Sequence, residues 1–349
     1  MIDISTLERS GSYRYGICPY CASSAQTLIV MPDDSYRCMS CGRAGIIGEE
    51  PVPQPKQQEQ TRLYKLNATA MGLFQRQLYG KYGAEGMDYL SGKRKLTDDT
   101  IKAFRLGYAR FSPYEDLKKH FSDEEMIASG LFKANEDGTL WFQLKGRVIY
   151  PIFDAQSRVI GFGGRVLDNS EPKYKNSPET AIFSKREHLY AWDKAVASKK
   201  SIPVLCEGYM DVISMHQAGL DSAVASLGTA LTDEQARLIK SVSDKCVLLY
   251  DTDVPGQKAT ERAISVLKKA GVEAYVSNTL PAKDPDEFLK TYRVEELKKR
   301  LRRAMNEQEY RLRMAKRSDG EVDFEKTADI LLEAEPERAE KLLKKLTKI

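Results

Sequence analysis

The chain has 349 residues, of which 42% are hydrophobic and 30% charged, and its formal net charge is +4. This length is sufficient for two or more hydrophobic cores, which predicts a multi-domain protein. So small a net charge does not by itself indicate nucleic-acid binding. The sequence shows no signal peptide and no transmembrane run, so we expect a cytoplasmic protein with no membrane partner.

Four cysteines near the N-terminus have the spacing of a metal site. Cys18 and Cys21, then Cys38 and Cys41, form two Cys-x2-Cys pairs separated by 16 residues. Two-residue gaps allow a tight turn to direct both thiolates at one ion, so the spacing predicts a tetrahedral zinc site in a ribbon over residues 1–48. A pair of disulfides is the alternative interpretation, but structural disulfides are rare in the cytoplasm.

Aromatic and cationic side chains surround these cysteines, among them Tyr15, Tyr20, Arg37 and Arg43. Such residues suit stacking on unpaired bases and contact with phosphates. They suit equally well the small core of a ribbon and its solubilising charge. The sequence leaves both interpretations open.

Composition and periodicity divide the rest of the chain into four segments. Residues 49–62 are rich in Pro and Gln and lack an apolar period, which predicts a flexible linker. The elements expected within residues 63–200 are helices over 63–79 and 83–90, a helix capped by Thr97, and strands over 146–154 and 159–166. Strands and helices alternate over residues 201–290, which predicts a parallel sheet, and residues 291–349 are predicted to be helical. We therefore expect an α/β multi-domain fold with a β-type zinc ribbon, a mixed α/β core and C-terminal helices.

Three acidic clusters follow apolar runs of the predicted parallel sheet, and their members are Glu207, then Asp251 and Asp253, then Asp284 and Asp286. Ligand sites in parallel sheets lie beyond the carboxyl ends of the strands, so we expect the clusters to converge. Unpaired carboxylates repel one another, which predicts Mg²⁺, or Mn²⁺ in its place, between them. Any single acid of the set would also suit an ordinary turn. The combination predicts a divalent-metal site for phosphate chemistry.

The order Glu-Gly, Asp-x-Asp-x-x-Gly and Asp-Pro-Asp resembles the Toprim domain of topoisomerases, primases and related enzymes. The preceding segments Gly146–Ile152, Ile160–Leu167 and Pro172–Thr180 resemble the core of the DnaG-type replicative primases. The resemblance implies that residues 63–200 form the basic N-terminal part of an RNA polymerase core and that residues 201–290 form the Toprim metal-binding domain.

What this resemblance implies is synthesis of short RNA primers on single-stranded DNA from ribonucleoside triphosphates, beside a replicative helicase as partner. It assigns Glu207 to the reacting phosphate, and Asp251 and Asp253 to the metal. The residues matching template- or nucleotide-contacting positions of the family are Arg147, Arg165, Lys173, Tyr174, Asn176 and Lys185.

Mechanistically, we expect divalent ions held by Asp251, Asp253 and Asp286 to bridge the triphosphate and to lower the pKa of the attacking 3′ hydroxyl. Glu207 binds a further ion or assists proton transfer. Asp211 and Asp284 are additional candidates at the same edge of the sheet.

Two positions depart from the pattern of the cellular primases. Cys21 stands where the cellular family usually has His, and the resulting four-cysteine site resembles that of some phage primases. Val254 stands where cellular primases commonly have a basic residue after the second Asp. The sequence also stops at Ile349, where cellular relatives continue into a helicase-docking domain. We therefore expect either a compact phage-type primase acting in a bacterial host or a truncated chain.

Two other classes of protein share some of these motifs. A Toprim nuclease or topoisomerase has the same acids but cleaves phosphodiester bonds. A Toprim recombination mediator combines a ribbon with a Toprim domain and binds single-stranded DNA without catalysis. A type IA topoisomerase would need a far longer chain with a gated ring and a Tyr nucleophile, which this sequence does not supply. A recombination mediator would lack the basic block of roughly a hundred residues before the acids, and a loop of that length is improbable without a function. The sequence favours the primase.

Overall fold

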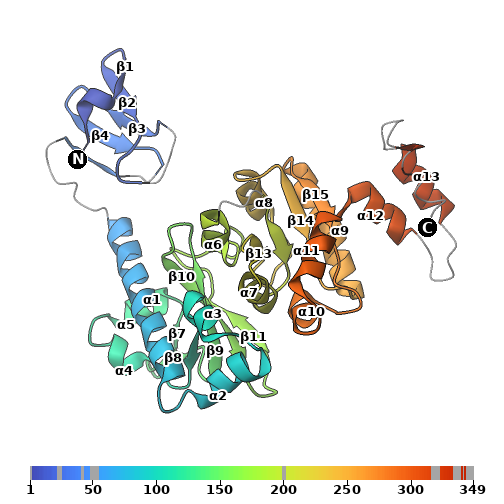
Figure 1. The fold of residues 1–349 in the computed structure, drawn as a ribbon. Helices are drawn as coiled ribbons and strands as arrows, with labels where there is room; N and C mark the ends of the chain where they lie inside the picture. The colour runs from blue at the N-terminus through green and yellow to red at the C-terminus, as the bar shows by residue number, and fades with distance from the viewer. Residues whose placement is uncertain are drawn as a thin grey trace. The chain divides into compact units, whose positions relative to one another are not determined.

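The computed structural model describes residues 2–21, 26–40, 43–47, 55–198, 202–315, 323–332, 339, 340 and 342. The chain divides into two compact units, Met1–Arg62 and Leu63–Ile349 (Figure 1). Within the part of the chain that the structure describes, no helix has the length and apolar character needed to cross a membrane.

The first unit is a small antiparallel sheet with strand order β1-β2-β3-β4-β5. Its elements are η1 (Ile4–Thr6), β1 (Glu8–Ser10), β2 (Tyr13–Gly16), β3 (Leu28–Val30), β4 (Ser35–Cys38) and β5 (Ala44–Ile46). Side chains alternate between the two faces of a strand, so Leu28 and Val30 are buried while Ile29 is exposed. They pack with Tyr36 against the thiols of Cys18 and Cys38, so the cysteines lie in the core of this sheet.

The predicted linker over residues 49–62 is wrong in its second half. Helix α1 (Pro55–Tyr79) begins inside it, whereas residues 48–54 lie outside the described part of the chain. The run of Lys, Gln, Glu and Arg after Pro55 consists of good helix formers, and Pro is favoured in the first turn of a helix. The absence of an apolar period therefore indicated an exposed helix end rather than a flexible chain.

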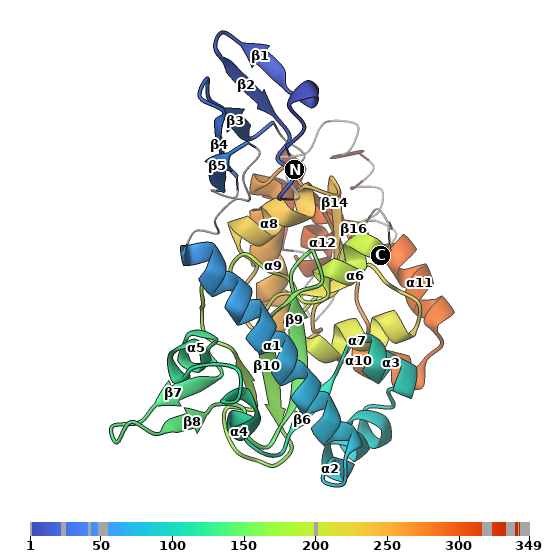
Figure 2. The same cartoon turned by 90° about the vertical axis from the view of Figure 1, so that its left-hand side faces the viewer.

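The N-terminal half of the second unit is built on the antiparallel sheet β11-β10-β9-β6. Its elements are α1, α2 (Ala84–Met87), η2 (Asp88–Lys93), α3 (Asp98–Ala103), β6 (Gly107–Ala109), α4 (Tyr114–Leu117), α5 (Asp123–Ala128), β7 (Phe132–Ala134), β8 (Leu140–Phe142), β9 (Arg147–Phe153), β10 (Val159–Val166), β11 (Tyr174–Asn176) and α6 (Trp192–Ala197). Helix α1 crosses the sheet (Figure 2), and Phe74 packs edge-on against Phe162 at 5.5 Å. Burying an aromatic side chain in this way contributes about 1.5–3 kcal/mol.

Four parallel strands and one antiparallel edge strand form the second sheet, in the order β13-β12-β14-β15-β16. The elements are β12 (Val204–Cys206), α7 (Tyr209–Gln217), β13 (Ala223–Ala225), α8 (Asp233–Lys240), β14 (Lys245–Leu248), α9 (Val254–Lys269), β15 (Glu273–Val276), α10 (Pro285–Thr291), α11 (Val294–Arg302), β16 (Met305–Asn306), α12 (Glu307–Met314) and α13 (Phe324–Leu332). The predicted alternation of strand and helix is confirmed. Because β12 and β14 are neighbours, the residues that follow them meet at one edge of the sheet.

Among the described residues of the second unit, hydrophobic cores extend across the predicted boundaries at 200 and 290. One cluster joins Tyr150 of β9 to Val212 of α7, Phe288 of α10 and Leu297 of α11. The segments 63–200, 201–290 and 291–349 therefore belong to one compact unit. The two sheets are held at fixed positions by this shared packing.

His216, near the end of α7, offers a test of this packing through pH. Its Nε2 lies 2.9 Å from the Ala223 carbonyl oxygen, its ring meets Phe104 edge-on, and burial lowers its pKa below the ordinary 6.5. Below pH 6.5 the unfolded chain takes up a proton that the folded chain resists, so stability falls as pH falls through that value. We expect His216→Gln to flatten this decline, measured by urea unfolding at a series of pH values. His120→Gln, at an exposed histidine, is the control and should leave the slope unchanged.

Candidate active site

Glu207 and Asp251 follow two neighbouring parallel strands and are held side by side. The Glu207 Oε1 atom accepts a hydrogen bond from the Asp251 backbone N–H at 3.1 Å. Both carboxyl groups are half-buried, and burial is the main cause that raises the pKa of each; the charge of Asp251 adds to the effect on Glu207. These two acids therefore have a stronger tendency to bind a proton or a cation than exposed carboxylates have.

Asp253 has the opposite electrostatic setting, because it caps a helix. Its Oδ1 accepts the Gly256 N–H at 3.0 Å at the start of α9. This hydrogen bond, followed by the contact with Lys283, lowers the pKa of Asp253. Its other oxygen, Oδ2, points toward Lys283. Asp253 is thus an ionised acid with one oxygen engaged in the cap and the other facing a cation.

Lys283 lies between the two aspartates. Its Nζ is 3.3 Å from Asp251 Oδ2 and 3.0 Å from Asp253 Oδ2. The Lys283 carbonyl oxygen accepts the Thr252 N–H at 3.0 Å, which fixes the α10 loop against the loop that carries the acids. The position between the aspartates therefore already attracts a positive charge.

The donor set here fits a hard divalent cation, because it consists of carboxylate oxygens arranged around an ammonium group. The oxygens are spread more widely than a closed site requires. Among the described residues, one group of three potential metal ligands has its ligand atoms within 4.8 Å of one another, and that group consists of cysteines. The acids would hold an ion if the Lys283 ammonium group left its position between Asp251 and Asp253, or if the loops that carry the acids moved slightly closer together.

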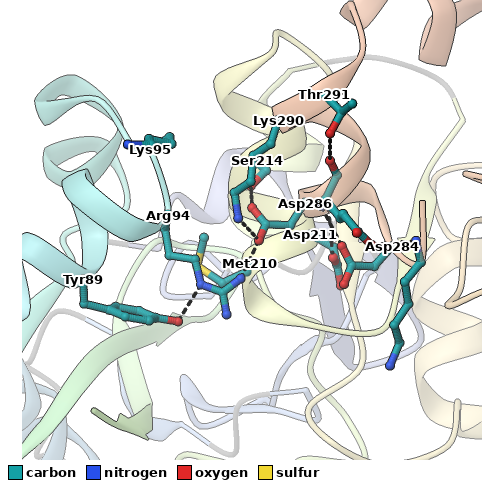
Figure 3. A network of polar contacts seen from close by, with 12 residues as sticks. Tyr89, Arg94, Lys95, Met210, Asp211, Ser214, Asp284, Asp286, Lys290 and Thr291 are labelled. Carbon is teal, nitrogen blue, oxygen red and sulfur yellow. Dashed lines mark hydrogen bonds and ion pairs between the residues drawn. The ribbon is translucent and has the colours of Figure 1, made fainter. Parts of the chain in front are cut away.

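Asp286, predicted to be a metal ligand, is engaged elsewhere (Figure 3). Its Oδ1 accepts a hydrogen bond from the Ser214 hydroxyl at 2.6 Å, and its Oδ2 is bound by Lys290 at 2.7 Å and by Arg94. The side chain is only 4% exposed. Both oxygens are occupied by protein donors, so Asp286 belongs to an internal ion-pair network in this structure, and its role as a metal ligand stays a prediction.

Asp284 is better placed than Asp286 to face the metal site. It caps α10 by accepting the Glu287 N–H at 2.7 Å. Burial is the main cause that raises the pKa of Asp251 and of Asp211, and the charge of Asp284 adds to both shifts. Asp211 is buried in α7 and accepts the backbone N–H groups of Gly208 and Asp286. Asp211 therefore positions the loop backbone, while Asp284 adds negative charge beside Asp251.

An aromatic and cationic cluster adjoins the Asp286 network. The Arg94 Nε donates to the Tyr89 hydroxyl at 2.7 Å, and the Arg165 guanidinium lies over the Tyr89 ring at 4.4 Å and the Tyr174 ring at 5.9 Å. The Arg165 Nε is buried and has no hydrogen-bond partner among the described residues. Sequence reasoning missed Tyr89 and Arg94, since 192 residues separate Arg94 from Asp286 and no local spacing indicates their contact.

The other predicted nucleotide or template contacts fall into exposed and partly buried positions. Lys173 is exposed on the loop before β11, and Lys185 is partly exposed. Asn176 is committed to the protein, because its Oδ1 accepts from the Tyr209 hydroxyl at 2.7 Å and its Nδ2 donates to the Leu227 carbonyl at 2.8 Å. These contacts join β11 to Tyr209 at the start of α7, two residues after Glu207, and to Leu227 after β13.

Arg147 is buried, contrary to the expectation of a nucleic-acid contact. Its Nη1 donates to the carbonyl oxygens of Gly164, Pro172 and Lys173 at 3.2, 2.9 and 3.4 Å, and burial lowers its pKa. The guanidinium thereby holds the β10–β11 connection in shape. Arg147 therefore has a structural role in positioning Lys173 and its neighbours, and a contact with nucleic acid or nucleotide stays a prediction.

The thiols of Cys18, Cys21 and Cys38 meet within 4.8 Å of one another in the first unit. The fourth predicted ligand, Cys41, lies outside the described residues. Three clustered thiols are a donor set that suits zinc, and the predicted convergence of these three residues is confirmed.

Comparison with known proteins places these sites in a family. The family described as "DNA primase catalytic core, N-terminal domain" matches residues 73–196, and the family described as "Toprim-like" matches residues 204–289. The DNA primase of Clostridium acetobutylicum is 32% identical over 98% of this chain. The chain belongs to the DnaG-type primase family. It spans 64% of the length of that curated relative.

Solved structures agree with this assignment along nearly the whole chain. The zinc-binding and RNA polymerase domains of the Aquifex aeolicus primase match 98% of this chain and 91% of that one, with a TM-score of 0.70 and 27% identity. A DnaG primase catalytic domain bound to ssDNA matches 84% of this chain with a TM-score of 0.69 and 27% identity. The cysteine-containing sheet and the core that follows it thus have counterparts in the same order along the chain.

The different positions of Asp284 and Asp286 predict different mutant phenotypes. Asp284→Asn should weaken Mn²⁺ binding and change the free energy of unfolding by less than about 0.5 kcal/mol, because Asn caps a helix as well as Asp does. Asp286→Asn should cost about 3 kcal/mol of stability, because it leaves Arg94 and Lys290 without their carboxylate. Urea unfolding and Mn²⁺ titration followed by electron paramagnetic resonance measure the two effects. Loss of Mn²⁺ affinity in a stably folded Asp286→Asn variant would restore the original prediction.

Proposed function

We propose that this protein is a DNA primase that synthesises short RNA primers on single-stranded DNA from ribonucleoside triphosphates. The observation that carries the proposal is the set Glu207, Asp251 and Asp253 at the carboxyl edge of a Toprim sheet, in the same compact unit as a primase core. The solved DnaG catalytic domain bound to ssDNA supports single-stranded DNA as the template.

Asp251, Asp253 and Asp284 would hold Mg²⁺, or Mn²⁺ in its place, which neutralises phosphate charge and lowers the pKa of an attacking hydroxyl. The residues of the chain orient the reactants around that site. Glu207, whose pKa burial raises, is placed to accept a proton beside Asp251. Arg165, Lys173 and Lys185 supply positive charge for the phosphates of template and nucleotide.

The ribbon would bind Zn²⁺ through Cys18, Cys21, Cys38 and Cys41 and would recognise the initiation site on the template. The convergence of three of these thiols in the core of the first unit supports the zinc assignment. The Arg43 guanidinium lies over the Tyr20 ring at 4.5 Å, so some of the aromatic and cationic residues pack within the ribbon. Tyr13 is 50% exposed and offers a surface for stacking on a base.

A replicative helicase as partner, the bacterial cytoplasm as location and the phage-type form remain proposals that rest on the family resemblance. A recombination mediator or nuclease is the less favoured function. The primase-core match over residues 73–196 accounts for the block that those proteins lack.

Substitution of the paired aspartates tests the activity. Asp251→Asn and Asp253→Asn should each reduce primer synthesis by about 100-fold or more, since a preorganised charged group at a reacting phosphate contributes on that scale. The assay supplies single-stranded DNA, labelled ribonucleotides and Mg²⁺, and resolves short RNA on a gel. Asp244→Asn, which removes the acid of the surface pair with Lys240, is the matched control and should remain active. Near wild-type synthesis by either site variant would reject the assignment.

Deletion of residues 1–48 separates recognition from chemistry. We expect the truncated protein to fold, because the second compact unit begins at Leu63, and to lose initiation at defined template positions. Extension of a pre-annealed primer should survive in part. Cys38→Ser should resemble the deletion, because three thiolates hold zinc less tightly and so small a ribbon depends on metal for folding. Unchanged start positions in the truncated protein would place site recognition in the core.

A further inference from the structure

Lys283 contacts both aspartates of the predicted metal pair at once. Its Nζ lies 3.3 Å from Asp251 Oδ2 and 3.0 Å from Asp253 Oδ2, and the side chain is 55% exposed. Two backbone contacts anchor the residue: its N–H donates to Glu287 Oε2 at 2.8 Å, and its carbonyl oxygen accepts the Thr252 N–H at 3.0 Å. The ammonium group is thus presented to the pair from a fixed loop.

The same oxygens that bind Lys283 are those that a divalent cation would use. Asp253 Oδ1 is occupied by the helix cap, so Oδ2 is its available oxygen, and Oδ2 is where Lys283 binds. Like charges on Asp251 and Asp253 repel each other, and a single positive charge between them relieves that repulsion. An ammonium group and a metal ion therefore compete for one position.

We propose that Lys283 is the built-in counter-cation of this site, which neutralises Asp251 and Asp253 in the metal-free protein and is displaced when a divalent ion binds. The inference rests on the proposed metal site and adds a determinant of its affinity. Lys283 stabilises the metal-free fold and lowers the affinity for metal, because its ammonium group and the metal ion compete for the same carboxylate oxygens. Lys283 is a positioning residue here, acting through the acids.

An ordinary surface ion pair is the simpler interpretation, and such pairs contribute little. Lys240 gives the comparison, since its Nζ binds Asp244 Oδ1 at 2.6 Å and the Lys240 side chain is 42% exposed. Lys240 contacts one carboxylate, and that carboxylate is 80% exposed. Lys283 contacts two, and the Asp251 side chain is only 18% exposed. Low exposure weakens the screening by water, so removal of Lys283 should have the larger effect.

The experiment measures Mn²⁺ binding to the full chain by electron paramagnetic resonance, without nucleotide or DNA. Lys283→Met should tighten Mn²⁺ binding by about threefold to tenfold, the range expected for two partly screened ion pairs. Lys283→Arg keeps the charge and should bind Mn²⁺ as the wild type does. Lys240→Met is the matched control and should also match the wild type. Asp251→Asn should lose most of the binding.

A second measurement separates competition from a folding defect. In EDTA, the melting temperature of Lys283→Met should lie below that of the wild type, because the paired acids lose the cation that contacts both of them. With saturating Mn²⁺ the difference should disappear, because the same ion then neutralises both proteins. A variant that simply folds poorly would remain less stable in both conditions.

The outcomes distinguish this inference from the proposed function. If the wild type binds Mn²⁺ and Lys283→Met binds it equally or less tightly, Lys283 is not a competitor and the inference fails alone. If the wild type shows no Mn²⁺ binding that depends on Asp251, the metal site itself is wrong and both proposals fail. A melting-temperature difference that persists in saturating Mn²⁺ also overturns the counter-cation role.

Discussion

Repulsion among carboxylates at one edge of a parallel sheet is the constraint around which this molecule is organised. Parallel strands β12 and β14 end side by side, so the acids that follow them must lie close together. Water cannot fully solvate Glu207 and Asp251, which are half-buried. Each acid of the edge is stabilised in a different way: a backbone N–H for Glu207, a helix N-terminus for Asp253, and protein cations for Asp286. The candidate active site consists of those acids whose negative charge is only partly stabilised by such contacts.

The Asp286 network also determines how the two halves of the second unit fit together. Arg94 follows η2 in the N-terminal half, whereas Ser214 and Lys290 belong to α7 and α10. One buried carboxylate therefore joins the basic, aromatic cluster around Tyr89 to the loops that carry the acids. These contacts hold the two surfaces at a constant distance from each other. The network supplies that distance through two ion pairs and one hydrogen bond within the protein.

Sequence reasoning found what is local or periodic. Cysteine spacing identified the ribbon, alternation identified the strands of the second sheet, and the Thr97 cap forms as expected, since its side chain accepts the Thr100 N–H. It failed where long-range contacts decide a residue's role. Asp284 and Asp286 are two positions apart in one motif, yet one faces the acids and the other is enclosed by Arg94, Ser214 and Lys290. Arg147 matched a basic motif, but the carbonyl groups that bury it lie on β10 and the β10–β11 connection, and spacing does not indicate them.

The early start of α1 has a consequence for the length of chain between the ribbon and this helix. Only the seven residues 48–54 separate Ile47 from the first residue of the helix, half the number in the linker that the sequence suggested. A chain extends by at most about 3.5 Å per residue, so Ile47 and Pro55 can lie no more than about 28 Å apart. The helix-forming residues after Pro55 thereby set an upper limit on the distance between Ile47 and the first residue of α1.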